Sequence, residues 1–203
     1  MIPSIEFLLL IFSITKLDTP NLADLSKAIR EGDHDAFKNF YDLNYASLYR
    51  FLVRRGILHD EAEDLIQKAF ILIWEKRETI DERKSLKAFL YQIAYRQMLN
   101  HLEYQSKFND EDLQDMEMIS NNAEDDDIDY PRLLNFIKKI ILTMPEKRRM
   151  VFELCFMKKF TYKEAADVLE VSIKTIENHM ALAFKDLRSA MIKYYGPEIE
   201  QKI

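Results

Sequence analysis

The segment TYKEAADVLEVSIKTIENHMALAFKDLRSAM (161–191) decides the fold of the C-terminal part of this chain. Thr161 and Glu164 have the spacing of a capping box, which predicts the start of a short helix. A tight turn at residues 170–171 follows, and Ser172 then predicts the N-cap of a longer helix. Two helices joined in this way have the proportions of a helix-turn-helix, whose second helix begins in the major groove of DNA. We therefore expect this segment to bind duplex DNA.

The polar residues around the predicted second helix are the candidate DNA contacts. Asn pairs with adenine, Lys with guanine and Glu with cytosine, while other basic side chains hold phosphates. The candidates are Lys163, Ser172, Lys174, Thr175, Glu177, Asn178, His179, Lys185 and Arg188. The expected buried stripe is Ile173, Ile176, Met180, Ala183, Phe184, Leu187 and Met191. A plain helical hairpin with a solvated face fits the same pattern. Glu170 stands where such turns often use Gly, and a positive φ there would cost about 1 kcal/mol.

Charge is distributed unevenly along the chain, whose formal net charge is -6. Residues 22–108 hold equal numbers of acidic and basic residues. Residues 109–131 hold ten Asp and Glu and no Lys or Arg, whereas residues 132–193 hold 13 Lys and Arg against seven Asp and Glu. The overall charge therefore conceals a basic C-terminal domain. The acidic stretch lacks helical periodicity and predicts a flexible linker.

Scarce turn residues predict an all-α fold, because sheet-rich folds need frequent tight turns and this chain has three Gly and five Pro. Apolar residues recur every three or four positions in the N-terminal half. Asp33 predicts one helix start, Asp60 with Glu63 predicts a second as a capping box, and Ser85 predicts a third. We expect two small helical domains joined by the acidic linker. The predicted boundaries are an apolar extension at 1–21, a first domain at 22–108, the linker at 109–131, a second domain at 132–195 and a tail at 196–203.

The sequence offers no group of residues that could carry catalysis. It has one cysteine, Cys155, and four widely separated histidines, so neither a disulfide framework nor a zinc site is expected. A phosphate loop and a nucleophile with a base are also missing. We expect a protein that is not an enzyme and has no cofactor, metal or small-molecule substrate, in the reducing cytoplasm. The apolar run at 7–14 is too short to span a bilayer and lacks signal-peptide flanks, so no membrane insertion is expected.

Two longer segments resemble one known family, in the order that the family has them. TMPEKRRMVFELCFMKKFTYKEAADVLEVSIKTIENHMALAFKDLRSAM (143–191) resembles region four of bacterial extracytoplasmic-function (ECF) sigma factors, which binds the -35 promoter element. Response-regulator output domains share much of this pattern. DAFKNFYDLNYASLYRFLVRRGILHDEAEDLIQKAFILIWEKRE (35–78) resembles region two of the same family, which binds core RNA polymerase and the -10 element. The polymerase contacts that this resemblance implies are Asp64, Gln67, Phe70 and Trp74. Core packing is the alternative for the two aromatic residues.

LKAFLYQIAYRQMLNHLE (86–103) resembles the part of region two that opens and reads the -10 element. The contacts that this implies are Arg83, Lys84, Tyr91, Tyr95, Arg96 and Asn100. Phe89, Arg96 and Glu103 depart from the residues common in the family, so the promoter sequence stays open. The resemblance also implies core RNA polymerase, promoter DNA and an anti-sigma factor as partners, with the acidic linker lying in a basic channel of the polymerase.

Other functional classes remain as alternatives from the sequence alone. A stand-alone helix-turn-helix regulator would use the first domain for sensing or dimerisation and bind DNA without polymerase. A helical adaptor would bind only proteins. An all-helical hydrolase has little support, because the acidic run lacks His partners and helical order.

Overall fold

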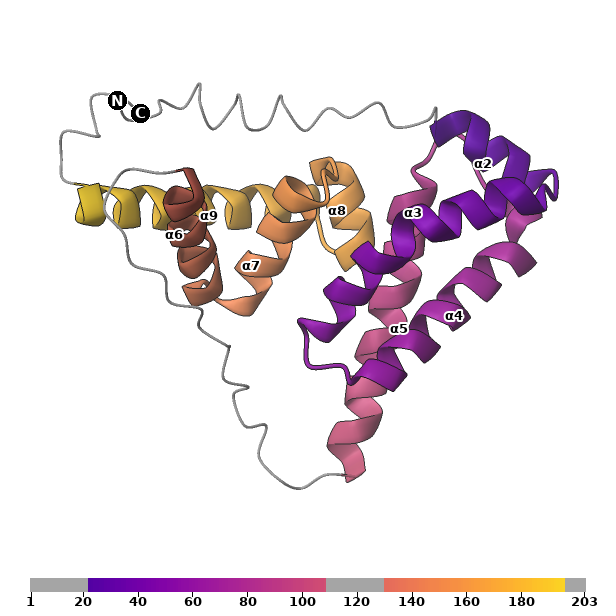
Figure 1. The fold of residues 1–203 in the computed structure, drawn as a ribbon, viewed down its shortest axis with the longest axis horizontal. Coiled ribbons are helices and arrows are strands. Elements are labelled where there is room, and N and C mark those ends of the chain that lie inside the picture. Colours follow the sequence, from indigo (N-terminus) through magenta and orange to yellow (C-terminus); the bar gives the residue numbers. More distant parts are fainter. Residues whose placement is uncertain (1–21, 109–129, 196–203) are drawn as a thin grey trace. The chain divides into compact units, whose positions relative to one another are not determined.

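The computed structural model describes residues 22–108 and 130–195, and every regular element in these ranges is a helix (Figure 1). The predicted all-α fold is confirmed. Two compact units divide the chain, one built around α2 to α5 and the other containing α6, α7, α9 and most of α8. The predicted extension, linker and tail lie outside the described residues, except that α6 already begins at Tyr130.

The first unit contains α2 (Leu22–Arg30), α3 (His34–Val53), α4 (His59–Glu75), the short 3-10 helix η1 (Arg77–Thr79) and α5 (Leu86–Phe108). α4 packs against both α3 and α5 (Figure 1). The interior is filled by large apolar side chains that are fully buried: Phe40, Leu48, Leu52, Ile66, Ile73 and Leu90. Each such side chain contributes about 1.5–3 kcal/mol by leaving water, so this interior fixes the bundle.

The sequence predicted the N-cap of α3 correctly but not that of α4. Asp33 caps α3 as expected, because its Oδ1 accepts hydrogen bonds from two backbone N–H groups, at 2.8 and 3.0 Å. The capping box predicted for α4 is wrong. That helix begins at His59, so Leu58 takes the N-cap position, two residues before the predicted Asp60. The residue three positions on is then Glu61, which accepts from the Leu58 backbone N–H at 3.3 Å, and Glu63 is left for another partner.

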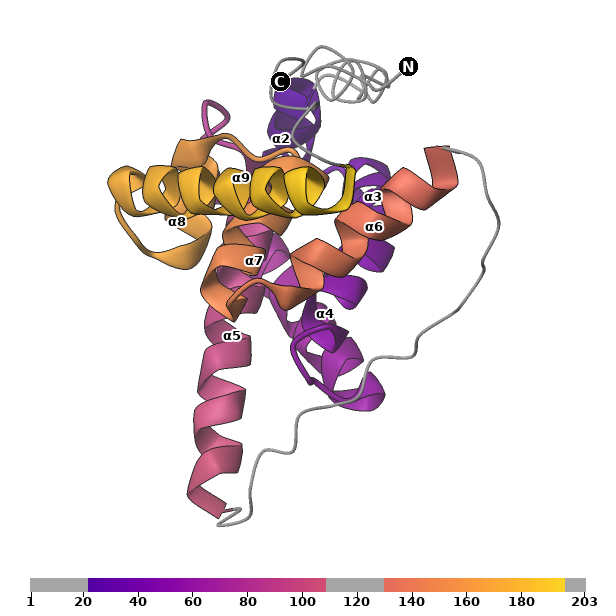
Figure 2. The same cartoon turned by 90° about the vertical axis from the view of Figure 1, so that its left-hand side faces the viewer.

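The second unit contains α6 (Tyr130–Thr143), α7 (Glu146–Phe152), the π-helical turn η2 (Glu153–Met157), α8 (Tyr162–Leu169) and α9 (Ile173–Tyr195). α9 packs across α7 and α6 (Figure 2). The shared interior includes Met150, Phe152, Leu154, Ile176, Met180 and Ala183. Arg148 of α7 also donates a 2.5 Å hydrogen bond to Asp186 of α9, which ties the two helices together.

Two members of the predicted buried stripe of α9 are instead exposed. Ile173 is 45% exposed and Phe184 is 48% exposed. Ile173 is the first residue of the helix, where fewer neighbours cover it. Phe184 follows the buried Ala183, so it lies about 100° around the helix from that stripe. Its ring still touches Phe152 edge to face, with ring centroids 6.2 Å apart.

Candidate nucleic-acid and protein interfaces

The helix-turn-helix segment has the caps that the sequence predicted. Thr161 N–H donates to Glu164 Oε2 at 2.7 Å, and Glu164 N–H donates back to Thr161 Oγ1 at 3.2 Å. Ser172 Oγ accepts from the Thr175 N–H at 3.0 Å and so starts α9. Glu170 adopts φ 55°, so this residue takes the left-handed conformation that such turns often give to Gly. The backbone therefore aims the start of α9 away from α8 in the manner of a helix-turn-helix.

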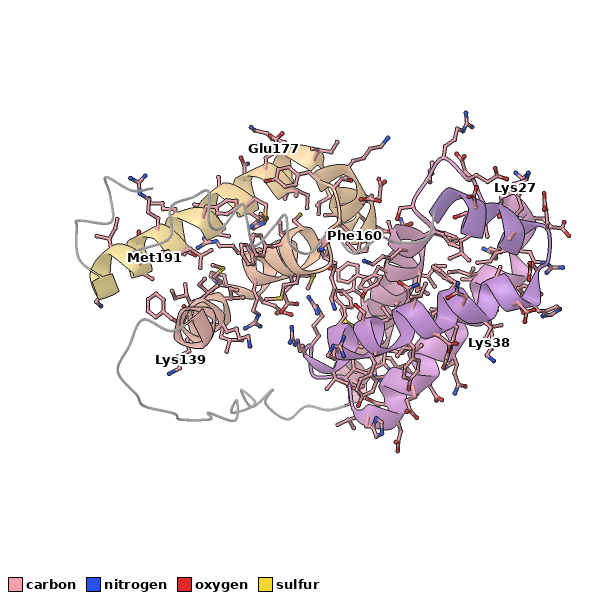
Figure 3. The ribbon with its side chains drawn as sticks, turned by 45° about the horizontal axis from the view of Figure 1, so that its top comes forward. Lys27, Lys38, Lys139, Phe160, Glu177 and Met191 are labelled. Carbon is pink, nitrogen blue, oxygen red and sulfur yellow. The ribbon has the colours of Figure 1, made fainter. Side chains whose placement is uncertain are left out.

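The outer side of α9 collects most of the predicted DNA contacts. Lys174, Asn178, Lys185 and Arg188 are exposed and follow helical spacing along one face. Figure 3 shows Glu177 near the start of this helix and Met191 near its end. Glu177 Oε2 lies 3.1 Å from Lys174 Nζ, so the two charges partly offset each other.

The remaining predicted contacts are half-buried, already hydrogen-bonded within the turn, or on α8. Thr175 and His179 are half-buried, and the hydroxyl of Ser172 is already used as the cap and in a 2.8 Å bond to the Thr175 hydroxyl. Lys163 is exposed on α8. These positions therefore support the face at its edges, and the exposed residues of α9 form its centre.

The outer face of α4 contains Asp64 and Gln67, both exposed. Ile71 lies on the same face, four residues after Gln67, and is 55% exposed. The sequence reasoning missed this apolar residue, although its spacing from Asp64 and Gln67 was the available signal. The face thus combines an exposed apolar side chain with polar neighbours.

Phe70 is buried, which favours the core-packing alternative over the predicted direct contact with a partner. Its exposure is 3%, and its ring packs against Tyr41 and Phe40 of α3, with centroids 4.7 and 5.7 Å away. The physical reason is its helical position, because Phe70 continues the stripe of Ile66 and Ile73 that faces the bundle. Its part is therefore to hold α4 against α3.

Trp74 has an intermediate position at the edge of the same interior. Its ring lies 4.5 Å from the His34 ring and 4.9 Å from the Phe37 ring, centroid to centroid. The Arg77 guanidinium lies over it, 4.7 Å from the centroid, and donates to the Trp74 carbonyl oxygen at 2.9 Å. Trp74 is half-buried, so it can contact both the interior and a partner.

Tyr91 is also buried, which argues against the predicted contact with the -10 strand. It is fully buried, its hydroxyl hydrogen-bonds the Ser47 hydroxyl at 2.8 Å, and its ring meets Phe51 at 5.2 Å between centroids. Burial raises the pKa of Tyr91 to about 12. A side chain enclosed in this way cannot stack on a base. On the same helix, Arg96 and Asn100 are exposed, and Tyr95 is half-buried.

The loop between η1 and α5 presents Arg83 and Lys84, both exposed. Asp81 Oδ1 accepts from the Arg83 backbone N–H at 3.1 Å and from its Nε at 3.2 Å. These hydrogen bonds lower the pKa of Asp81, the backbone bond contributing most. The Lys84 N–H also donates to the Asp81 carbonyl oxygen at 2.9 Å. Asp81 therefore gives this basic loop a defined turn at the start of α5.

Within the described ranges, no three His, Cys, Asp or Glu side chains gather where a metal ion could be held. The same part of the chain has no helix of the length and apolarity that a membrane span requires. The Cys155 thiol is buried, and burial raises its pKa to about 11.

Comparison with known proteins places this chain in a family. Residues 40–108 match the family model for Sigma-70 region 2, and residues 137–187 match that for Sigma-70, region 4, together more than half of the chain. The chain is 25% identical over 176 residues to the ECF sigma factor SigW of Bacillus subtilis, covering 81% of this chain and 94% of SigW. The chain belongs to the ECF sigma factors. It is also 25% identical over 181 residues to the ECF sigma factor RpoE of Cereibacter sphaeroides, covering 87% and 98% of the two chains.

Solved structures share the fold of this sigma factor. RpoE of Bartonella quintana, solved with the anti-sigma factor NepR, matches with a TM-score of 0.56 and 24% identity over 76% of this chain and 96% of that one. CnrH, solved with the cytosolic domain of CnrY, matches with a TM-score of 0.57 and 17% identity over 84% and 97%.

The family defines the function of the chain. It is an alternative sigma factor, which binds core RNA polymerase and promoter DNA and directs transcription initiation. Sigma factors are non-enzymatic initiation factors. The alternative of a stand-alone helix-turn-helix regulator is not favoured, because such a regulator has no need of region two.

Proposed function

We propose that this sigma factor binds core polymerase through the outer face of α4, centred on Ile71 and including Asp64, Gln67 and the half-buried Trp74. The observation that carries this proposal is the exposure of Ile71, 55%, on a helix whose other large apolar side chains are mostly turned inward. An apolar centre with polar neighbours is the composition of protein–protein interfaces. Asp64 and Gln67 would then set the orientation of the partner through hydrogen bonds.

The promoter is contacted by two further surfaces. The start of α9 reads the -35 duplex through Lys174, Glu177 and Asn178, while Lys163, Lys185 and Arg188 hold phosphates. Ser172, Thr175 and His179 support that face from its edges. The opened -10 strand meets the loop residues Arg83 and Lys84 and the exposed side of α5, which carries Arg96 and Asn100, while the half-buried Tyr95 lies nearer to Tyr91. Tyr91 takes no direct part.

We also propose that an anti-sigma factor regulates this sigma factor. RpoE of Bartonella quintana was solved with the anti-sigma factor NepR, and CnrH with the cytosolic domain of CnrY. We extend a partner of the anti-sigma kind to this chain. The chain itself performs no catalysis and acts in the cytoplasm, where the polymerase carries out RNA synthesis. The domain limits proposed are 22–108 and 132–195, with the acidic residues 109–131 lying in a basic channel of the polymerase.

Co-elution with sigma-free core polymerase from the host tests the α4 interface. Ile71→Asp should abolish co-elution in gel filtration while helicity stays that of the wild type, because the side chain is on the surface. Leu43→Asp on α3 is the matched control, since Leu43 is 53% exposed and receives the same substitution. It should co-elute normally. If both variants bind, the α4 face is not the site, and if the wild type fails to bind a competent host polymerase, the proposed function is lost.

A further inference from the structure

Helix α2 lies outside the residues that match Sigma-70 region 2, so the family match assigns it no role. It is nevertheless firmly part of the first unit. Ile29 is completely buried, Ser26 is 2% exposed, and the helix packs against both α3 and η1. The turn that follows α2 also approaches η1, since a Cβ on Gly32 would lie 3.8 Å from Arg77 Nε. α2 therefore adjoins the segment that leads into the basic loop.

One ion pair joins α2 directly to that loop. Arg30 Nη2 lies 2.9 Å from Glu82 Oε1, and the two side chains are 43% and 31% exposed. Glu82 immediately precedes Arg83 and Lys84, the two loop residues proposed to meet the -10 strand. A contact at Glu82 therefore restrains the loop immediately before Arg83 and Lys84.

The other anchors of the loop come from the loop itself and the helices on either side. Arg77 is held by Trp74 at the end of α4, and Ile80 is buried with 7% exposure. At the far end, Ser85 Oγ accepts from the Ala88 N–H at 3.1 Å and starts α5. Arg30 differs from these because it reaches the loop from a separate helix.

Charge gives the Arg30 contact a second consequence. The loop carries two carboxylates, Asp81 and Glu82, and two cations, Arg83 and Lys84, so its own charges cancel. Arg30 neutralises Glu82 and leaves an excess of positive charge beside the proposed strand-binding residues. A polyanionic strand is attracted to such an excess and repelled by an unpaired carboxylate.

We propose that Arg30 is a positioning residue for -10 recognition, which holds Glu82 so that Arg83 and Lys84 are presented to the opened promoter strand. This inference rests on the proposed function of the loop. It assigns α2 to promoter opening, separately from polymerase binding by α4 and -35 binding by α9.

The test uses holoenzyme reconstituted with host core polymerase. Wild-type holoenzyme first selects a single-stranded DNA oligonucleotide from a pool of randomised sequence, and its Kd for that oligonucleotide is then measured for each variant. Arg30→Glu should weaken binding about three- to tenfold, because an attraction between partly exposed charges becomes a repulsion. The double exchange Arg30→Glu with Glu82→Arg should return the Kd to within about twofold of wild type.

The matched control is Lys27→Glu, which makes the same charge change on the same helix (Figure 3). Lys27 pairs with Glu31 of its own segment, at 4.0 Å, and should leave the Kd unchanged. Equal effects of Arg30→Glu and Lys27→Glu, or no rescue by the double exchange, would overturn the inference. A combined Arg83→Ala and Lys84→Ala variant tests the proposed DNA contact of the loop separately from the positioning role of Arg30. If this variant bound the oligonucleotide with the wild-type Kd, the proposed function of the loop would itself be refuted.

Discussion

Replacing Phe70 with Ala should unfold the first unit more easily without removing a partner contact. Phe70 is 3% exposed, and its ring has Tyr41, Phe40 and Phe37 at centroid distances of 4.7, 5.7 and 6.1 Å. Truncating a Phe packed in this way costs about 3–5 kcal/mol, from lost burial and from the cavity left behind. That is a large part of the roughly 5–15 kcal/mol that stabilises a typical domain.

Equilibrium unfolding in urea, followed by tryptophan fluorescence, measures this loss. Trp74 is the single tryptophan of the chain and lies in the same unit, so its signal reports that unit. The neighbouring Ile71→Ala, at an exposed position, should change the free energy of unfolding by less than about 0.5 kcal/mol. If Phe70→Ala abolished polymerase binding while its stability stayed within about 1 kcal/mol of wild type, Phe70 would be a contact residue and the burial argument would be refuted.

Three further predictions follow from individual contacts. Ser172→Ala should cost about 1 kcal/mol, seen as faster hydrogen exchange of the Thr175 amide, and unchanged exchange would contradict the cap. Tyr91 has a folded pKa of about 12 against an ordinary value of 10.0, so the stability from its neutral phenol is complete below pH 10 and is lost as pH rises towards 12. Urea unfolding across that range should show that the free energy of unfolding falls less for Tyr91→Phe than for the wild type. An equal fall would contradict the role of the buried phenol. Cys155, with its pKa raised to about 11, should react with a disulfide reagent at neutral pH only after unfolding, so rapid labelling of the native protein would be the contrary result.

Features set by local hydrogen bonds were predictable from the sequence. The caps at Asp33, Thr161 and Ser172 depend on a side chain and a backbone N–H two or three residues away, and all three occur as predicted. Such features need no knowledge of the rest of the fold. The left-handed conformation of Glu170 was not predicted, because the sequence left open how its turn is built.

Side-chain placement in α4 could not be predicted in the same way. The run at residues 69–74 is apolar on nearly every side, so periodicity alone does not decide whether Phe70 or Ile71 turns inward. The aromatic side chains of α3 decide it by packing on Phe70. Contacts between distant residues also could not be predicted from the sequence. The Arg30–Glu82 ion pair, for example, joins positions that no local pattern connects.

The placement of Tyr91 resolves how α5 can belong to the core and also face a nucleic acid. Its ring and hydroxyl hold α5 against α3 through Phe51 and Ser47. At 100° per residue, Asn100 lies about 180° around the helix from Tyr91, and Arg96 about 140°. Arg96 and Asn100, which we propose to meet the -10 strand, are therefore turned away from the bundle and follow a loop that presents two cations. Core packing at Tyr91 fixes the rotation of α5 and so places these two side chains on the exposed side of the helix.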